Sequence, residues 1–469
     1  MIDTWDNNLG VCEVLDEDLE NVKRIAGQKI QNLTSSDNSD VWLFPKPGKR
    51  HGDYIEQDVV FTLADKRITT GNIMGFIGYD KTEITIHSRF APKYEKDYLM
   101  QYLLQKVFAV NIFDLKHSSD TENALDLAVL LFPYFLQKAL SQGLYREYQR
   151  IEYNNDRVKG TIDFSRHIKS NFPFQDGKVS YATQEYRYDN PITQLIRHTI
   201  EHIKSRQHSS FILFSSPEIK SLVNTIINAT PSYNRSARLK VLSQNLRPRI
   251  HPFYSEYLPL QRICIQILRN DRISYGKDSN RIHGVLFDGA WLWEQYLQLT
   301  LKSLGFKHPD NKKGTDAIHV FSDRGGYPRF PDYVLDDIIM ADAKYKRLLN
   351  ASDNGPKGAI PRDDLNQMIT YLHLTRSNIG LFLCPYEEID NTLFENTSGF
   401  SQFASSMRYR VGTIKGYGGE IHIIGVKIPQ TCNDFDAFYA KMTESEHALF
   451  NLMRRVISGE NMDKKYDWC

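Results

Sequence analysis

The sequence predicts an α/β protein whose C-terminal part is a mixed sheet flanked by helices, preceded by a β-rich N-terminal region and a helical middle region. Residues 291–384 alternate segments of helical apolar spacing with short, β-prone apolar runs, in the order helix, hairpin, helix, strand. Residues 41–90 show short strand-like runs, whereas helical spacing prevails in residues 98–144 and 257–268. A chain of 469 residues, 41% of them hydrophobic, can fill two or three separate cores.

Polar stretches indicate where the domains meet. We expect an N-terminal arm at residues 1–40, a β-rich and helical domain at 41–165, a helical middle region at 166–275 and a C-terminal domain at 276–469. The first boundary follows the polar run Thr34 to Asp40, and the last lies in the polar, charged run Asn270 to Arg281. The basic loop at residues 45–51 is expected to be an ordinary solvated loop.

Local patterns place the elements of the N-terminal two thirds. Apolar residues from Leu15 to Ala26 recur at helical spacing, and this segment either packs on its own domain, which we favour, or docks on a partner. Asn190 and Pro191 are the expected cap and first-turn proline of a later helix. The other expected elements are strands at 72–78 and 82–87, helices at 98–110 and 124–144, a hairpin at 148–162 turning at 154–156, and helices at 191–203 and 257–268.

The C-terminal region is organised around a predicted hairpin at residues 330–345, whose two apolar runs contain the charged residues Asp332, Asp342 and Lys344. Side chains on a strand alternate between faces, so Asp342 and Lys344 share one face. Asp332 joins them only if positions 332 and 342 lie opposite each other, which requires an odd number of connecting residues or a bulge. We therefore predict a connection of about three residues, 336–338, or a bulge near Asp332. A regular two-residue turn would argue against a shared site.

These three charges predict a site for phosphodiester hydrolysis. The carboxylates of Asp332 and Asp342 and the backbone carbonyl of Ala343 offer the oxygen ligands that Mg²⁺ prefers while it keeps several waters. Such an ion would polarise a phosphodiester and lower the pKa of a bound water, and Lys344 would orient that water or offset the charge developing on phosphorus. The alternative, which the pattern alone leaves open, is an exposed charged hairpin without a catalytic role.

The hairpin and its flanks together resemble the PD-(D/E)xK nuclease superfamily. In that superfamily the helix before the hairpin often supplies a glutamate to the metal site, and Glu294 on the expected helix 291–299 is the candidate; a solvated glutamate on a helix face is the alternative. After the hairpin, Gln367 and Tyr371 lie four apart on one flank of an expected helix, which resembles the Q-x-x-x-Y element of many such nucleases. These two side chains would support the site or contact DNA, although a plain polar helix edge gives the same pattern.

Four segments narrow the resemblance to the McrC family, the nuclease subunit of McrBC-type restriction systems directed at 5-methylcytosine or at related specific sequences. They are residues 292–296, 330–332, 341–346 and 364–371, and a looser likeness extends through 75–78 with 83–87 and through 143–146 with 159–163. The resemblance implies cleavage of double-stranded DNA that is licensed by a hexameric AAA+ GTPase of the McrB type, which the β-rich region within 41–165 would engage. The chain has no G-x-x-x-x-G-K-[ST] motif, so GTP would bind the partner.

Two other functions stay open beside the partner-dependent nuclease. The chain could act mainly as a scaffold that plugs the AAA+ ring and stimulates its GTPase without cutting efficiently, although the complete set of Asp332, Asp342 and Lys344 argues against this. It could also cut DNA with Mg²⁺ or Mn²⁺ in the absence of any partner.

Charge composition limits where a DNA-binding surface can lie. The formal net charge is only +1, so no global field attracts the chain to DNA, and any binding surface must be local. One basic cluster is a candidate for phosphate contacts, with a solvated helix face as an equally weighted alternative. Its members are Arg235, Arg238, Lys240, Arg247 and Arg249.

Cysteine usage and apolar runs bear on the cellular compartment. The five cysteines form no C-x-x-C pair, which argues against structural zinc and against a disulfide framework and fits a reducing cytoplasm. The N-terminus has neither the basic region nor the apolar core of a secretory signal. The longest apolar run, residues 127–136, is too short to span a bilayer and contains Pro133, where we expect a helix kink. We therefore expect a soluble, cytoplasmic protein without membrane contact.

Overall fold

The chain divides into two compact units, one formed by Met1–Ala109 with Ser279–Cys469 and the other by Val110–Asp278. The second unit is thus inserted into the sequence of the first. The basic loop predicted at residues 45–51 lies outside the described residues. The computed structural model describes residues 2–35, 39–44, 59–92, 97–108, 124–173, 176–206, 210–214, 216–249, 251–273, 282–309, 317–321, 323, 327–336, 338–350, 357–358, 360–387, 400–403 and 406–459.

The domain boundaries expected from the sequence differ from this division. The expected start of the C-terminal domain, residue 276, lies close to the return of the chain to the first unit at Ser279. Residues 1–40, expected as an N-terminal arm, lie within the first unit. The expected domain 41–165 is split, since the second unit begins at Val110.

Strand pairing explains why the first unit combines both ends of the chain. Strand β11 (Ile282–Asp288) follows the second unit in the sequence but lies between β6 (Ile73–Tyr79) and β3 (Ser39–Phe44). It is antiparallel to β6 and parallel to β3. Every residue of β11 is buried, so its backbone groups need partners on both edges, and strands from the N-terminal part supply them.

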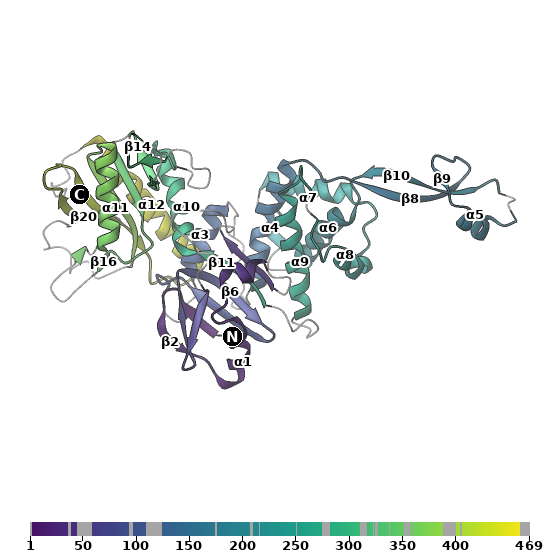
Figure 1. Ribbon diagram of the computed structural model, residues 1–469, viewed down its shortest axis with the longest axis horizontal. Helices are drawn as coiled ribbons and strands as arrows, with labels where there is room; N and C mark the ends of the chain where they lie inside the picture. Colours follow the sequence, from purple (N-terminus) through teal and green to yellow (C-terminus); the bar gives the residue numbers. More distant parts are fainter. Residues whose placement is uncertain are drawn as a thin grey trace. The chain divides into compact units, whose positions relative to one another are not determined.

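The N-terminal sheet has five strands in the order β1, β7, β6, β11, β3 (Figure 1). Strands β6 and β7 (Thr82–His87) pair antiparallel, and the strands predicted at 72–78 and 82–87 are confirmed. Helix α1 (Asp16–Ile25) buries Val22 and Ile25 in the same core, so it packs on its own domain, as we favoured. The other elements of this part are β1 (Ile2–Trp5), β2 (Leu9–Glu13), α2 (Ile30–Ser35), β4 (Phe61–Ala64), β5 (Arg67–Thr70) and α3 (Tyr98–Phe108).

The second unit is mainly helical. Helix α6 (Pro191–Ser205) begins as predicted, because the Asn190 side chain accepts hydrogen bonds from the backbone N–H groups of Ile192 and Thr193, and Pro191 occupies the first turn. Helix α4 (Ala124–Ser141) contains Pro133. Further helices of this unit are α7 (Pro217–Ala229), α8 (Arg238–Gln244), α9 (Tyr257–Ile273) and the short 3₁₀ turns η2 (Ser210–Phe214) and η3 (Arg235–Ala237).

An extended β-arm belongs to the second unit and corrects the hairpin predicted at residues 148–162 (Figure 1). Strand β8 (Glu147–Asn155) pairs along its nine residues with β10 (Val179–Arg187), and β9 (Thr161–Ile162) lies on the other edge of β10. The nearby strand β9 has only two residues, whereas β10 pairs with all nine residues of β8. The longer pairing is therefore the one that forms. The chain between β9 and β10 includes α5 (Phe164–Asn171).

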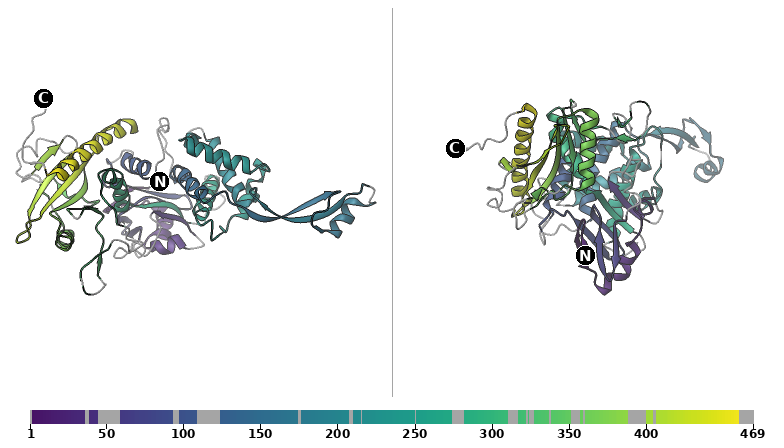
Figure 2. Two further views of the ribbon diagram at one scale, coloured as in Figure 1. Left: turned by 90° about the horizontal axis from the view of Figure 1, so that it is seen from above. Right: turned by 60° about the vertical axis from the view of Figure 1, so that its left-hand side comes forward.

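The C-terminal sheet has six strands in the order β14, β15, β18, β21, β20, β19. Strands β15, β18 and β21 are mutually parallel, and the outer pairings are antiparallel. Helix α11 packs on one face of this sheet and α12 on the other (Figure 2), while α10 contacts β15 and α12. The predicted order of helix, hairpin, helix and strand is confirmed.

The bounds of these elements are as follows. The strands of the C-terminal sheet are β14 (Tyr333–Leu335), β15 (Ile339–Ala343), β18 (Ile379–Glu387), β19 (Phe400–Phe403), β20 (Ser406–Thr413) and β21 (Glu420–Ile428). The helices are α10 (Gly289–Ser303), α11 (Arg362–Thr375) and α12 (Phe435–Ser458). Two short ribbons are formed by β12 (Ile318–His319) with β13 (Pro328–Arg329) and by β16 (Leu349–Asn350) with β17 (Lys357–Gly358). In the described part of the chain, no helix combines the length and apolar character needed to cross a membrane.

Candidate functional site

The register of the β14–β15 hairpin decides which side chains share a face. Tyr333 pairs with Ala341 and Leu335 with Ile339, which leaves residues 336–338 as the connection. The backbone N–H of Ile338 donates to the carbonyl of Leu335 at 2.9 Å and closes the turn. The predicted three-residue connection is confirmed, and continuing this register places positions 332 and 342 opposite each other.

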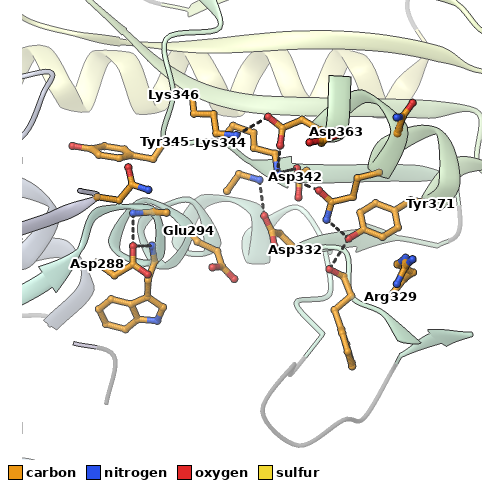
Figure 3. A pocket seen from close by; sticks show the side chains of 18 of the residues that line it. Asp288, Glu294, Arg329, Asp332, Asp342, Lys344, Tyr345, Lys346, Asp363 and Tyr371 are labelled. Atoms are coloured by element: carbon orange, nitrogen blue, oxygen red, sulfur yellow. Dashed lines mark hydrogen bonds and ion pairs between the residues drawn. The ribbon is translucent and has the colours of Figure 1, made fainter. Parts of the chain in front are cut away.

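A cavity of about 940 Å³ in the first unit gathers the predicted site residues (Figure 3). Most of its lining comes from the start of α10, from the hairpin and from α11. The predicted residues that line it are Glu294, Asp332, Asp342, Ala343, Lys344, Gln367 and Tyr371. Residues from three separate segments of the chain therefore meet at one hollow, as a shared site requires.

Asp332, Asp342 and Lys344 are fixed by short polar contacts. Oδ2 of Asp332 accepts a hydrogen bond from the backbone N–H of Ala343 at 2.7 Å, which joins the two hairpin strands at the site. Nζ of Lys344 lies 2.6 Å from Oδ2 of Asp342. Because Asp342 is buried with 3% exposure, its carboxylate depends on this ammonium for charge compensation.

Burial and neighbouring carboxylates shift the pKa of two groups at the hairpin. Burial raises the pKa of Asp332 well above its ordinary value, and the neighbouring carboxylates of Asp342 and Glu294 raise it further. Burial alone would lower the pKa of Lys344, but the carboxylates of Asp342 and Asp364 outweigh burial and raise it. The ammonium is therefore held in its charged form by the acids around it.

Acidic side chains outnumber basic ones around the whole cavity. It is lined by six carboxylates, of Asp288, Glu294, Asp332, Asp342, Asp363 and Asp364. Four cations face them, those of Arg89, Arg329, Lys344 and Lys346. An anionic ligand would meet net repulsion here unless a cation entered with it.

Glu294 lies at the α10 side of the cavity. Its Oε1 is 3.4 Å from Nε2 of His308, and its backbone carbonyl accepts a hydrogen bond from the hydroxyl of Tyr333. The other ring nitrogen of His308, Nδ1, is 2.6 Å from the backbone oxygen of Asp332. Helix α10 is thereby tied to the segment that leads from Asp332 into β14, and the carboxylate of Glu294 lies close enough to raise the pKa of Asp332.

Gln367 and Tyr371 join α11 to the hairpin. The side-chain amide of Gln367 donates to the Tyr371 hydroxyl at 2.6 Å, and that hydroxyl donates to the backbone carbonyl of Phe330 at 3.0 Å. The amide oxygen of Gln367 accepts from Nζ of Lys344 at 3.4 Å. The polar flank predicted for this helix therefore faces the site, and Gln367 contacts Lys344 directly.

Sequence reasoning missed Asp364 on the same helix. Its Oδ1 is 3.3 Å from Nζ of Lys344 and its Oδ2 is 2.7 Å from Nζ of Lys346. Asp364 precedes Gln367 by three residues and Tyr371 by seven, so helical spacing places all three on one face. That spacing is the signal that could have revealed it.

A second group that sequence reasoning missed comes from the N-terminal sheet region. The hydroxyl of Tyr345, the residue after Lys344, is 2.6 Å from Oγ of Ser88. The guanidinium of Arg89 lies 5.0 Å from the centre of the Tyr345 ring and also lines the cavity. At Gly289 any side chain would meet this ring, since a Cβ there would be 2.8 Å from it. No local pattern links residues so far apart in the sequence.

The basic cluster proposed for phosphate contacts lies in the second unit, on η3, on α8 and in the segment after α8. Arg249 forms an ion pair with Glu147 at 2.8 Å, and Arg238 donates to the backbone carbonyl of Leu268 at 2.9 Å. These two arginines thus have roles within their own unit. Contact of Arg235, Arg238, Lys240, Arg247 and Arg249 with phosphates stays a prediction.

The carboxylates of the cavity bear on whether it can hold a metal ion. Among the described residues, no group of three or more His, Cys, Asp or Glu side chains is arranged to hold one. Mg²⁺ needs fewer protein ligands, because it binds through one or two carboxylates and keeps several waters. Asp332 and Asp342 on opposite positions of the hairpin fit that requirement, and the excess of carboxylates in the cavity favours a cation.

The fold and the cavity define a mixed α/β protein with a lysine and paired aspartates on a hairpin at the edge of its C-terminal sheet. Residues 68–384 match the family model described as McrBC 5-methylcytosine restriction system component. The chain belongs to this family, which confirms the family expected from the sequence.

Two solved structures are similar to this chain. One is the refined half-complex from a tetradecameric assembly of Thermococcus gammatolerans McrB AAA+ hexamers with bound McrC; identity is 16%, coverage is 96% of this chain and 99% of that chain, and the TM-score is 0.49. The other is the cryo-EM structure of the Thermococcus gammatolerans McrBC complex, with 17% identity, coverage of 66% and 89% respectively, and a TM-score of 0.33. A search of curated proteins found no match.

Proposed function

We propose that this chain is the McrC-type nuclease subunit of its restriction system, a Mg²⁺-dependent endonuclease that hydrolyses phosphodiesters of double-stranded DNA. The observation that supports this most directly is the hairpin register, which places Asp332 and Asp342 opposite each other and next to Lys344 at one cavity. The order of α10, β14–β15, α11 and β18 agrees with a PD-(D/E)xK core. Membership of the family supports the restriction function.

The proposed roles follow from the contacts. Asp332 and Asp342, with the carbonyl of Ala343, would hold Mg²⁺, which when bound polarises the phosphodiester and activates a water. Lys344 would orient that water or offset the charge on phosphorus. Glu294 would support the site beside Asp332.

The α11 residues have supporting roles in this proposal. Gln367 would steady the Lys344 ammonium, with which it shares a hydrogen bond. Tyr371 would hold the segment before Asp332 through its bond to the Phe330 carbonyl. Both residues line the cavity, so direct contact with DNA is the alternative role for them.

The proposal includes an AAA+ partner of the McrB type that binds GTP and forms a hexamer. The chain lacks a P-loop motif, so a nucleotide-driven system would take GTP hydrolysis from another chain.

An exposed apolar face supports a docking role for the tip of the β-arm. Helix α5 buries none of its residues, and Phe164, Ile168 and Phe172 are 69%, 56% and 74% exposed. The region expected to bind the partner, 41–165, includes β8, β9 and the first residues of α5, but not the rest of α5 or β10.

Asp342→Ala tests the proposed function in the complex assembled with its partner. We expect DNA cleavage to disappear while stimulation of the partner GTPase survives, because Asp342 lies in the cavity and not on the β-arm. Cleavage and GTP hydrolysis are measured on the same preparation. Intact cleavage by this variant would show that the hairpin is not the catalytic site.

The two alternative functions give other results with the wild-type chain. A scaffold that only stimulates the GTPase would show stimulation and no cleavage in the assembled complex. A partner-independent nuclease would cut DNA alone in Mg²⁺ or Mn²⁺ at the rate of the complex.

Replacing Phe164 and Phe172 by aspartate tests the docking role of the β-arm. We expect at least a tenfold weaker apparent affinity for the partner, roughly the loss of one interface anchor, measured as GTPase stimulation against chain concentration. The matched control is Phe253→Asp, since Phe253 is 81% exposed elsewhere in the same unit. Equal effects of the two changes would argue against the arm as the docking element.

A further inference from the structure

Lys344 lies between carboxylates that belong to two different elements. Its Nζ is 2.6 Å from Oδ2 of Asp342 on β15 and 3.3 Å from Oδ1 of Asp364 on α11. The amide oxygen of Gln367 adds a third acceptor at 3.4 Å, again from α11. Only 15% of the Lys344 side chain is exposed, so the ammonium depends on these acceptors more than on water.

Asp364 is itself held in place by two lysines. Its Oδ1 faces Lys344, and its Oδ2 is 2.7 Å from Nζ of Lys346. The Asp364 side chain keeps only 11% of its surface exposed, whereas Lys346 keeps 48%. Because each carboxylate oxygen already faces a lysine, Asp364 is better placed to hold an ammonium group than to bind a metal ion.

A cation bound at Asp342 would compete with Lys344 for the same carboxylate. Two positive charges repel each other more strongly as they approach, and a divalent ion doubles the effect. With Asp342 as its one anionic partner, Lys344 would have to withdraw or keep the ion out. Asp364, on the α11 side of the ammonium, offers a second anionic partner that the ion does not occupy.

We propose that Asp364 is a positioning residue that retains the Lys344 ammonium in the cavity when a divalent cation occupies Asp342. The inference rests on the proposed function in taking Asp342 as a metal ligand. Asp364 acts through Lys344, and Lys346 fixes the carboxylate so that one oxygen stays turned toward Lys344. Lys344 can then stay close to the reacting phosphate instead of being expelled by the ion that it accompanies.

A double-mutant cycle on metal affinity tests this role. The full-length wild type, Asp364→Asn, Lys344→Ala and the double variant are titrated with Mn²⁺, and free Mn²⁺ is measured by its electron paramagnetic resonance signal. We expect Asp364→Asn to weaken Mn²⁺ binding by about 10- to 100-fold, the range typical of groups that orient metal ligands. With Lys344 replaced by alanine, Asp364→Asn should weaken binding far less, because no ammonium remains to be held.

Two further variants keep the test specific. Asp363→Asn is the matched control for loss of charge, since it removes a carboxylate of the same cavity lining from the preceding, exposed residue of α11. Asp364→Glu keeps the carboxylate and should recover most of the affinity. The positioning role is wrong if Asp364→Asn weakens binding no more than Asp363→Asn, if it acts equally with and without Lys344, or if Asp364→Glu recovers nothing.

If the proposed function itself is wrong, a different result of the Mn²⁺ titration is expected. Wild-type chain would then bind Mn²⁺ no better than a variant in which Asp332 and Asp342 are both alanine. A kinetic readout separates positioning from a general loss of structure: in the assembled complex, Asp364→Asn should lower kcat for DNA cleavage and leave the KM for DNA nearly unchanged. A rise in KM with unchanged kcat would contradict the proposal.

Discussion

Replacing Lys344 by alanine is expected to slow DNA cleavage by the assembled complex about 100- to 1,000-fold, the usual effect of removing one group that stabilises developing charge. The Lys344 ammonium lies 2.6 Å from Asp342 and lines the cavity beside Asp332. The surrounding carboxylates raise its pKa despite burial, so it stays charged near neutral pH. The variant loses that charge where negative charge would develop on phosphorus.

The measurement is single-turnover cleavage with the partner, GTP and Mg²⁺ present. Lys302→Ala is the matched control, since Lys302 is an exposed lysine near the end of α10. Denaturant unfolding of both variants separates a loss of chemistry from a loss of folded chain. Cleavage by Lys344→Ala at the rate of Lys302→Ala would remove the hairpin lysine from the mechanism.

Replacing Asp6 by alanine is expected to destabilise the first unit by about 3–5 kcal/mol, the usual cost of breaking a buried ion pair from one side. Asp6 accepts hydrogen bonds from the backbone N–H of Arg89 and from its Nε, the latter at 2.8 Å. The two side chains are 0% and 8% exposed. Burial raises the pKa of Asp6 to about 6, although the Arg89 guanidinium opposes this shift.

The loss of folding stability in Asp6→Ala arises from the Arg89 side chain, which remains buried. Without Asp6, the Arg89 guanidinium keeps its bond to Asn72 but loses its compensating charge in a buried place. We expect cleavage to fall as well, because Arg89 lies against the Tyr345 ring, next to Lys344 in the sequence.

Chemical denaturation measures this prediction, with Asp16→Ala as the matched control. Asp16 also forms an ion pair, at 2.6 Å from Lys66, but the two side chains are 80% and 46% exposed. An exposed pair contributes little, so this control should unfold close to the wild type. If both variants unfold at the same denaturant concentration, the buried pair does not stabilise the first unit.

The hairpin geometry was predictable because strand parity is a local property. If Asp332 and Asp342 share one face, the count of residues between them requires an odd connection or a bulge, and the paired residues confirm a connection of three residues. The start of α6 was predictable for a similar reason, since Asn190 and Pro191 act within one turn of the helix.

Pairings between distant segments were not predictable from local patterns. The partner of β8 is β10, more than twenty residues downstream, and not the nearby segment that a hairpin pattern favoured. Strand alternation shows that a segment is a strand, but the same alternation fits several partners. Pairing and packing also set the extent of each unit, and the boundary expected after residue 165 falls inside the second unit, Val110–Asp278.

By itself, the sequence determined the family, the order of helices and strands around the hairpin, and the shared face of Asp342 and Lys344, because spacing within a short segment encodes all three. Only the tertiary structure decided that β11 completes the N-terminal sheet, that Arg89 lines the cavity and that Asp364 pairs with Lys344. These contacts join separate elements, and packing and charge compensation in the folded chain select them.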